Sequence, residues 1–111
     1  MGIKLPIIHS YKRFDKFGRV YLVNVEIEQS GDLKKFIPDG IKCVFRLMRV
    51  SEVNSHCYEL VVLIDNHAPY GFHQHDKLPG VQDSRTSIQA TNWKEAWLYF
   101  DRLLEEIMDE T

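Results

Sequence analysis

The chain has 111 residues, of which 44% are hydrophobic and 27% charged, and its net charge is −2. A chain of this length and composition predicts one folded domain over residues 1–111 and excludes a disordered or disulfide-dependent protein. The charge balance supplies no general attraction to nucleic acid or acidic lipid, so any such binding must be local. No segment approaches the roughly 20 apolar residues that span a bilayer, and no membrane association is expected.

The first part of the chain predicts two strands and a loop. Residues 14–18 read as a turn, and residues 7–13 can pair across it as a first strand. A loop with one helical turn is expected at residues 29–40. Residues 19–28 show the alternation of a half-buried strand, with one face formed by Tyr21, Val23, Val25 and Ile27.

Residues 41–50 and 56–65 predict a long antiparallel hairpin, because two β-type runs flank a short polar segment. A hairpin centre near Val53 keeps Cys43 and Cys57 apart in register, so we expect two buried, reduced thiols in a cytoplasmic protein. The second arm is apolar on both faces, which places it centrally in the sheet. One of its faces is expected to carry Tyr58, Leu60, Val62 and Ile64.

The C-terminal part predicts a weak edge strand at residues 81–90 and a helix at residues 92–109. Asn92 can cap the helix, and Glu95 can close a capping box with it. The apolar side chains recur at helical spacing: Trp93, Ala96, Trp97, Phe100, Leu103, Leu104 and Ile107.

Together these elements predict an α+β fold, a mainly antiparallel sheet of four or five strands with the C-terminal helix packed on one face. The other face is left for loops, a partner chain or a substrate, and a homodimer can form through it or through the sheet edge.

The polar groups that follow the second hairpin arm form the candidate site. The apolar run ends at Asp65, Asn66 and His67, and His73 and His75 follow with one residue between them. In an extended segment this spacing puts both imidazoles on one side. Such residues can ligate a transition metal, exchange protons near neutral pH, or stand without chemistry in a turn that Asp65 and Asn66 cap. The residues alone leave these three roles open.

Two segments of this region resemble small proteins of the TumE type, the toxin half of bacterial and archaeal toxin–antitoxin pairs. Members have a strand that ends in a Tyr-Asp-Asn-Ala-Pro-His-like turn, a Phe-Pro-His-His-Lys-His-like segment and a C-terminal helix. Here residues 64–69 (IDNHAP), residues 71–77 (GFHQHDK) and the helix at 92–108 correspond, and the resemblance covers about residues 41–108. His67 is an insertion, and Gln74 replaces a cationic residue. The family-like positions are therefore Asp65, Asn66, His73 and His75.

The resemblance implies a toxin-like role with an antitoxin protein as partner. RNA is the expected target, with His73 and His75 as general acid and base beside Asp65. Lys42 and Arg46 are expected to contact phosphate. The remaining candidate binding residues are Asn66, His67 and Lys77.

Two other functions are left open. A non-enzymatic module can bind a partner protein through the uncovered sheet face and the loop of residues 65–75. A metal-dependent hydrolase is disfavoured, because no H-E-x-x-H-like or carboxylate-rich ligand set accompanies the histidines. We expect no bound metal and no other cofactor, since histidines in a flexible turn lack the fixed surroundings that tight metal sites require.

Overall fold

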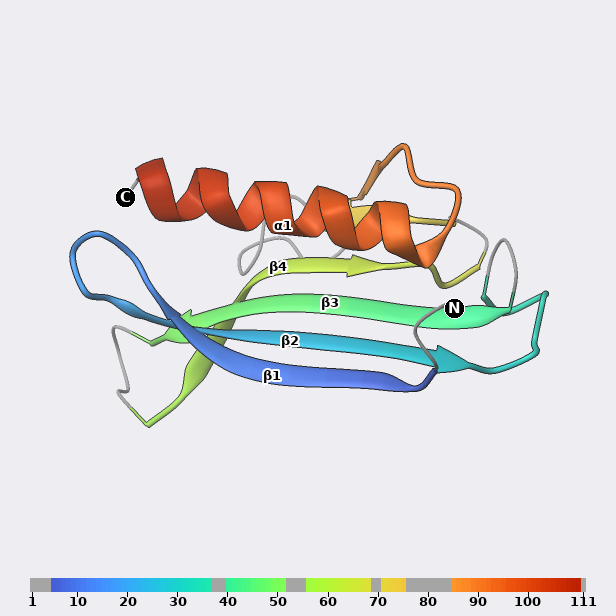
Figure 1. The fold of residues 1–111 in the computed structure, drawn as a ribbon, viewed down its shortest axis with the longest axis horizontal. Helices are drawn as coiled ribbons and strands as arrows, with labels where there is room; N and C mark the ends of the chain where they lie inside the picture. Colours follow the sequence, from blue (N-terminus) through green and yellow to red (C-terminus); the bar gives the residue numbers. More distant parts are fainter. Residues whose placement is uncertain (1–4, 37–39, 52–55, 69–70, 76–84, 111) are drawn as a thin grey trace.

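The computed structural model describes residues 5–36, 40–51, 56–68, 71–75 and 85–110. Among these residues, six strands form one sheet in the order β1-β2-β3-β4-β5-β6, and each neighbouring pair is antiparallel. Helix α1 (Trp93–Glu110) follows the strands and lies over one face of the sheet (Figure 1). The predicted α+β class, with an antiparallel sheet and a C-terminal helix on one face, is confirmed. The strands are β1 (Ile7–Phe14), β2 (Val20–Gln29), β3 (Ile41–Val50), β4 (Tyr58–Asp65), β5 (His73–His75) and β6 (Thr86–Ser87).

The turn between β1 and β2 is held by the carboxylate of Asp15. Its Oδ1 accepts hydrogen bonds from the backbone N–H groups of Phe17 and Arg19, both at 2.9 Å. Its Oδ2 accepts one from Nε of Arg19 at 2.6 Å. Gly18 has a positive φ of 79°, which glycine adopts more easily than other residues. These contacts join the two strands that were predicted on either side of the turn.

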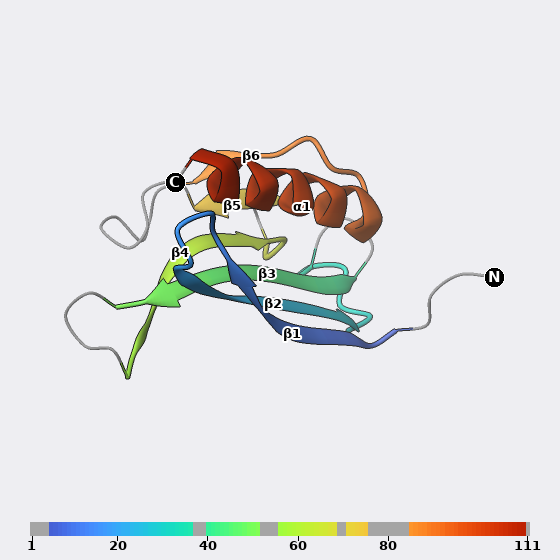
Figure 2. The same ribbon diagram turned by 60° about the vertical axis from the view of Figure 1, so that its left-hand side comes forward.

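The face of the sheet beneath α1 forms the core. The ring of Phe45 on β3 packs against Trp97 and Phe100, with ring centroids 6.5 and 5.4 Å apart. Figure 2 shows α1 as a second layer along the strands. The predicted helical stripe is therefore the surface that covers the sheet. The residues with no exposed surface in this core are Val23, Val25, Ile27, Phe45, Leu47, Ile64, Ala96, Phe100 and Leu104.

The opposite face of the sheet, here called the open face, carries no helix among the described residues. The strand register places Ile8, Phe14 and Tyr58 on it, and these residues are 61%, 60% and 43% exposed. Arg46 also projects from this face, in register with Asn24. Within the described ranges, no helix is long and apolar enough to cross a membrane.

The β3–β4 hairpin contains a bulge that was not predicted. Val62 and Leu60 are the partners of consecutive β3 residues, so Val61 is an extra residue on β4. The extra residue shifts the alternation of side chains. Tyr58 and Leu60 lie on the open face, whereas Val62 and Ile64 lie in the core beneath α1. The prediction that these four side chains share one face is wrong.

The start of α1 differs in one detail from the predicted capping box. The Asn92 side chain accepts a hydrogen bond from the Glu95 N–H at 3.0 Å, as expected of a cap. The Glu95 carboxylate reaches one residue further back than predicted, and accepts hydrogen bonds from the Thr91 hydroxyl at 2.6 Å and the Thr91 N–H at 2.9 Å. These two hydrogen bonds lower the pKa of Glu95 below its ordinary value.

Three further details correct the sequence-based predictions. Cys43 and Cys57 are both free thiols, but only Cys43 is buried and Cys57 is exposed. An edge strand was expected at residues 81–90, and within the described residues of this range only β6 is a strand. Residues 81–84 lie outside the described residues. β5 is a strand where a loop was expected, which brings the number of strands in the described part of the chain to six.

Candidate functional site

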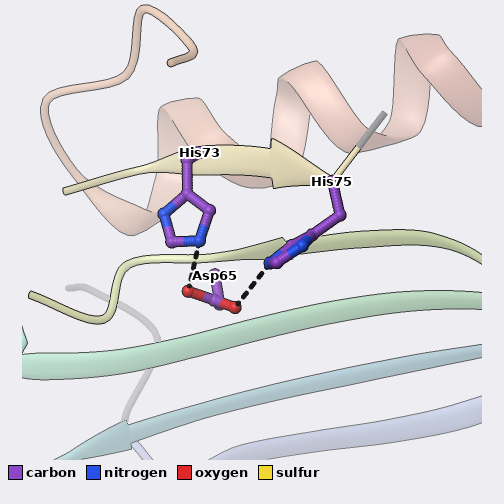
Figure 3. Close-up of side chains that lie close together, drawn as sticks. All are labelled: Asp65, His73 and His75. Atoms are coloured by element: carbon purple, nitrogen blue, oxygen red, sulfur yellow. Dashed lines mark ion pairs between the residues drawn. The ribbon is translucent and has the colours of Figure 1, made fainter. Parts of the chain in front are cut away.

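β5 brings the two predicted histidines against β4. In the antiparallel register His73 lies opposite Asp65 and His75 lies opposite Leu63, so both imidazoles project on the open face. Gln74 stands between them and lies on the side of the sheet that α1 covers. Figure 3 shows both rings directed at the Asp65 carboxylate. Strand pairing therefore assembles one carboxylate and two imidazoles from two separate segments.

The three side chains, here called the Asp–His–His group, lie close together. Asp65 Oδ1 is 3.0 Å from His73 Nε2, and Asp65 Oδ2 is 3.7 Å from His75 Nε2. The two imidazole centroids are 5.2 Å apart. Oδ1 also accepts a hydrogen bond from the backbone N–H of His67 at 3.1 Å. The carboxylate therefore lies between both rings and is nearer to His73.

The surroundings of His73 determine what must lie between it and Asp65. Its Nδ1 is 2.8 Å from the carbonyl oxygen of Gly71, which can only accept a hydrogen bond, so Nδ1 carries a hydrogen. Nε2 then faces the carboxylate, which is also an acceptor. Two lone pairs do not approach to 3.0 Å favourably, so a proton or a metal cation is required between Nε2 and Oδ1.

Both histidines are buried, with 3% of His73 and 8% of His75 exposed, whereas the Asp65 side chain is 20% exposed. The expectation that the histidines lie in a flexible turn is wrong, because they belong to a paired strand. On the helix side of the sheet, the Tyr99 hydroxyl donates a hydrogen bond to Gln74 Oε1 at 2.6 Å. This contact anchors β5 to α1 between the two histidines.

Asn66 holds the chain directly after Asp65. Its side chain is fully buried, and its Oδ1 accepts a hydrogen bond from the Cys43 N–H at 2.9 Å. Its Nδ2 donates to the Ile41 carbonyl at 2.7 Å. The side chain thus extends the pairing with β3 beyond the end of β4. Asn66, which was predicted as a binding residue, therefore stabilises the backbone that positions Asp65.

A pocket of about 280 Å³ lies beside the group. Asp65 belongs to both the group and the pocket lining. Phe36, which ends a single helical turn, stands at the pocket, and its ring meets His67 edge-on with centroids 5.8 Å apart. The predicted residue Lys77 lies outside the described residues. The other predicted binding residues all line the pocket: Lys42, Arg46, Asn66 and His67.

Arg46 is engaged with two neighbours on β2. Its Nη1 donates to Asn24 Oδ1 at 2.7 Å and to Glu26 Oε2 at 3.0 Å. The side chains of Arg46 and Glu26 are 34% and 32% exposed. A salt bridge that reaches solvent in this way contributes only about 0–1 kcal/mol. Arg46 can therefore exchange this carboxylate for another anion at little cost.

Three contributors to the site were not predicted from the sequence. Glu26 could have been found, because it alternates with the core positions of its strand and so lies on the open face with Arg46. The carbonyl of Gly71 and the hydroxyl of Tyr99 carry no comparable signal, since their contacts depend on where β5 pairs.

Comparison of the chain with models of known protein families, with curated proteins and with solved structures gives no match. Its function is therefore inferred from the chemistry of the Asp–His–His group.

Proposed function

We propose that this protein is a TumE-like toxin component of a toxin–antitoxin pair and that it cleaves RNA at the Asp–His–His group. The observation that carries the proposal is the gathering of Asp65, His73 and His75 on the open face. The two segments that hold these residues are the segments that resemble the TumE type. An antitoxin protein is the partner that this function requires.

RNA strand cleavage makes two chemical demands. The 2′-hydroxyl must lose a proton in order to attack the phosphorus, and the leaving 5′ oxygen must gain one. Imidazole and carboxylate groups can meet these demands by proton transfer, and an ion held by them would supply positive charge that stabilises the phosphate. Proton transfer and ion binding both use the carboxylate and the imidazoles together, so the reaction centre is the whole group.

Two cations beside the group support the proposal. Lys42 and Arg46 line the pocket that Asp65 borders. In a chain with a net charge of −2, attraction to RNA must come from such a local pair. Contacts to phosphate position the strand without reading its sequence. These two residues therefore give the proposed activity little base specificity.

Growth inhibition on induced expression and cleavage of a single-stranded RNA by the purified chain test the proposal. Asp65→Asn and His75→Gln should abolish both activities, because each removes a member of the group. His56→Gln is the matched control, since His56 is an exposed histidine near the opposite end of β4. Circular dichroism of each variant checks the fold, because His75 is buried.

Full growth inhibition by a folded Asp65→Asn, His75→Gln double variant would exclude the group as the reaction centre. If the unchanged chain, expressed alone, leaves growth unaffected, the toxin function falls. A neighbouring gene for a small helix-turn-helix protein, together with relief of inhibition on its co-expression, would support the toxin–antitoxin pair.

The open face supports a second candidate function, a non-enzymatic module that binds a partner protein or a second copy of the chain. Ile8, Phe14 and Tyr58 expose apolar side chains there, and exposed apolar surface is typical of protein interfaces. In sedimentation over a range of concentrations, Phe14→Asp should dissociate such a homodimer, whereas Leu98→Asp on the exposed side of α1 should not. A chain that stays monomeric at every concentration excludes the homodimer.

A further inference from the structure

We infer that the Asp–His–His group is a binding site for one divalent transition-metal ion. The ligands are the Asp65 carboxylate, His73 Nε2 and His75 Nε2. The site shares its residues with the proposed reaction centre, but the inference goes beyond that proposal and does not require RNA to be the substrate.

The donor atoms are spaced as a shared ion requires. One donor atom from each of the three residues lies within 4.8 Å of the other two. The carboxylate oxygens are 3.0 and 3.7 Å from the nearest imidazole nitrogens. Ligands that share an ion at bond lengths of about 2.0–2.2 Å lie roughly 3–3.5 Å apart. Small side-chain rotations are therefore enough for the three donors to close around an ion.

The contact between Asp65 and His73 calls for a proton or a metal cation between the two atoms. Because Nδ1 of His73 donates to the Gly71 carbonyl, Nε2 turns a lone pair toward the carboxylate whenever the ring is neutral. An ion between the two atoms replaces this repulsion with two favourable bonds. Metal-bound histidines commonly have this arrangement, in which the second ring nitrogen donates to a backbone carbonyl.

Contacts around the group hold the ligands in place. Tyr99 anchors Gln74, which stands between the two histidines, from the helix side of the sheet. The side chain of Asn66, the residue after Asp65, is hydrogen-bonded to β3. Such surrounding hydrogen bonds orient ligands and strengthen binding. The prediction that no metal is bound assumed histidines in a flexible turn, and that premise is wrong.

The donor set restricts the class of ion. Two imidazoles and one carboxylate suit zinc, iron(II), cobalt(II) or manganese(II), whereas magnesium and calcium prefer oxygen ligands. Three protein ligands leave at least one position for water or substrate, as in catalytic metal sites. The pocket lined by Lys42 and Arg46 begins at Asp65. An anionic group bound to the ion would therefore lie near two side-chain cations.

Metal titration of the full chain tests the inference. The chain is purified without an affinity tag, stripped with EDTA, and titrated with ZnCl₂ by calorimetry and with CoCl₂ by visible absorption. We expect one ion per chain, micromolar or tighter binding, and cobalt bands of a nitrogen–oxygen site. His75→Gln should weaken binding by at least about 100-fold, because it removes a ligand and not merely a surrounding contact. His56→Gln should leave binding unchanged.

A measurement on the unchanged chain covers the case in which His75→Gln fails to fold. In ¹⁵N NMR of the imidazoles, zinc should shift the Nε2 resonances of His73 and His75 and leave those of His9 and His56 in place. Shifts confined to other histidines, undiminished binding by a folded His75→Gln chain, or no binding at millimolar zinc would each overturn the site.

The two proposals fail in distinguishable ways. A chain that binds zinc through His73 and His75 but leaves growth and RNA intact keeps the metal site and loses the toxin function. A chain that cleaves RNA in EDTA and binds no zinc keeps the function and loses the metal site.

Discussion

Single side chains fix the backbone at both ends of the sheet, and Asp15 does so at the turn between β1 and β2. Burial acts to raise the pKa of Asp15, but hydrogen bonds from the Arg19 N–H, the Arg19 guanidinium and the Phe17 N–H lower it below its ordinary value. A carboxyl with a lowered folded-state pKa stabilises the fold above its ordinary pKa. This stabilisation is lost as the pH falls through the folded-state value.

Asp15→Asn should therefore lower the free energy of unfolding at neutral pH. The difference between the two chains should shrink as the pH falls below about 4. Denaturant unfolding of both chains between neutral and acidic pH measures the difference. Glu28→Gln, a change at an exposed position on β2, is the control. A deficit of Asp15→Asn that does not change with pH would contradict the role given to this carboxylate.

Asn66 has the corresponding role where β4 leaves β3. Asn66→Ala removes two hydrogen bonds to β3, a buried one from the Cys43 N–H and a partly buried one to the Ile41 carbonyl. Loss of a buried hydrogen-bond partner costs about 1–3 kcal/mol, so we expect the free energy of unfolding to fall by roughly 2–4 kcal/mol. Asn24→Ala, which removes an acceptor from Arg46 on the half-buried open face, should cost only about 1 kcal/mol. Equal losses in chemical denaturation would contradict the assignment.

The identity of the main site residues could be predicted from the sequence, but their burial and their contacts could not. Asp65, His73 and His75 attract notice in the sequence because polar groups follow an apolar strand, and the structure brings them together. Their burial could not be predicted, because it depends on the pairing of β5 with β4. The ion pair of Arg46 depends in the same way on the register between β2 and β3.

Among the elements, α1 contributes most of the surface that covers the sheet. Phe100 has no exposed surface and packs on Phe45 of β3. Phe100→Ala should lower the free energy of unfolding by about 3–5 kcal/mol, because it leaves a cavity between the layers. Leu98→Ala, at a position 56% exposed on the same helix, should change it by no more than about 0.5 kcal/mol. Thermal or denaturant unfolding that gives similar losses for both would contradict this packing.

The regular elements were predictable because each has a period of its own. β2 shows alternation, and α1 shows a helical stripe with a cap, so both follow from local sequence. β5 has only three residues, too few to show a period, and its strand character comes from pairing with β4. The face that each side chain of a long hairpin occupies can be predicted from alternation only up to the point where an extra residue interrupts the strand.

For the whole molecule, the small net charge limits how RNA can be held. If Lys42 and Arg46 neutralise two phosphates, the logarithm of the binding constant should fall with the logarithm of salt concentration with a slope of about −1.4. Fluorescence anisotropy of a labelled single-stranded RNA with the His75→Gln chain measures this slope. Lys42→Ala should reduce it by about 0.7, and Lys94→Ala on α1 should not change it. An unchanged slope for Lys42→Ala would place the RNA elsewhere.

The extra residue Val61 has a consequence for the chemistry of the molecule. Along a regular strand, the parity of the separation between two residues decides whether they face the same side. Leu60 and Leu63 are an odd number of positions apart, yet both face the open side because Val61 adds one to the count. If Val61 were paired in regular alternation instead of bulging, either Tyr58 and Leu60 would turn toward α1, or Asp65 would turn away from both histidines. Loss of the bulge can therefore remove the carboxylate from the group as completely as its substitution, whereas deletion of Val61, which leaves Leu60 and Val62 adjacent, keeps the side chains on their present faces.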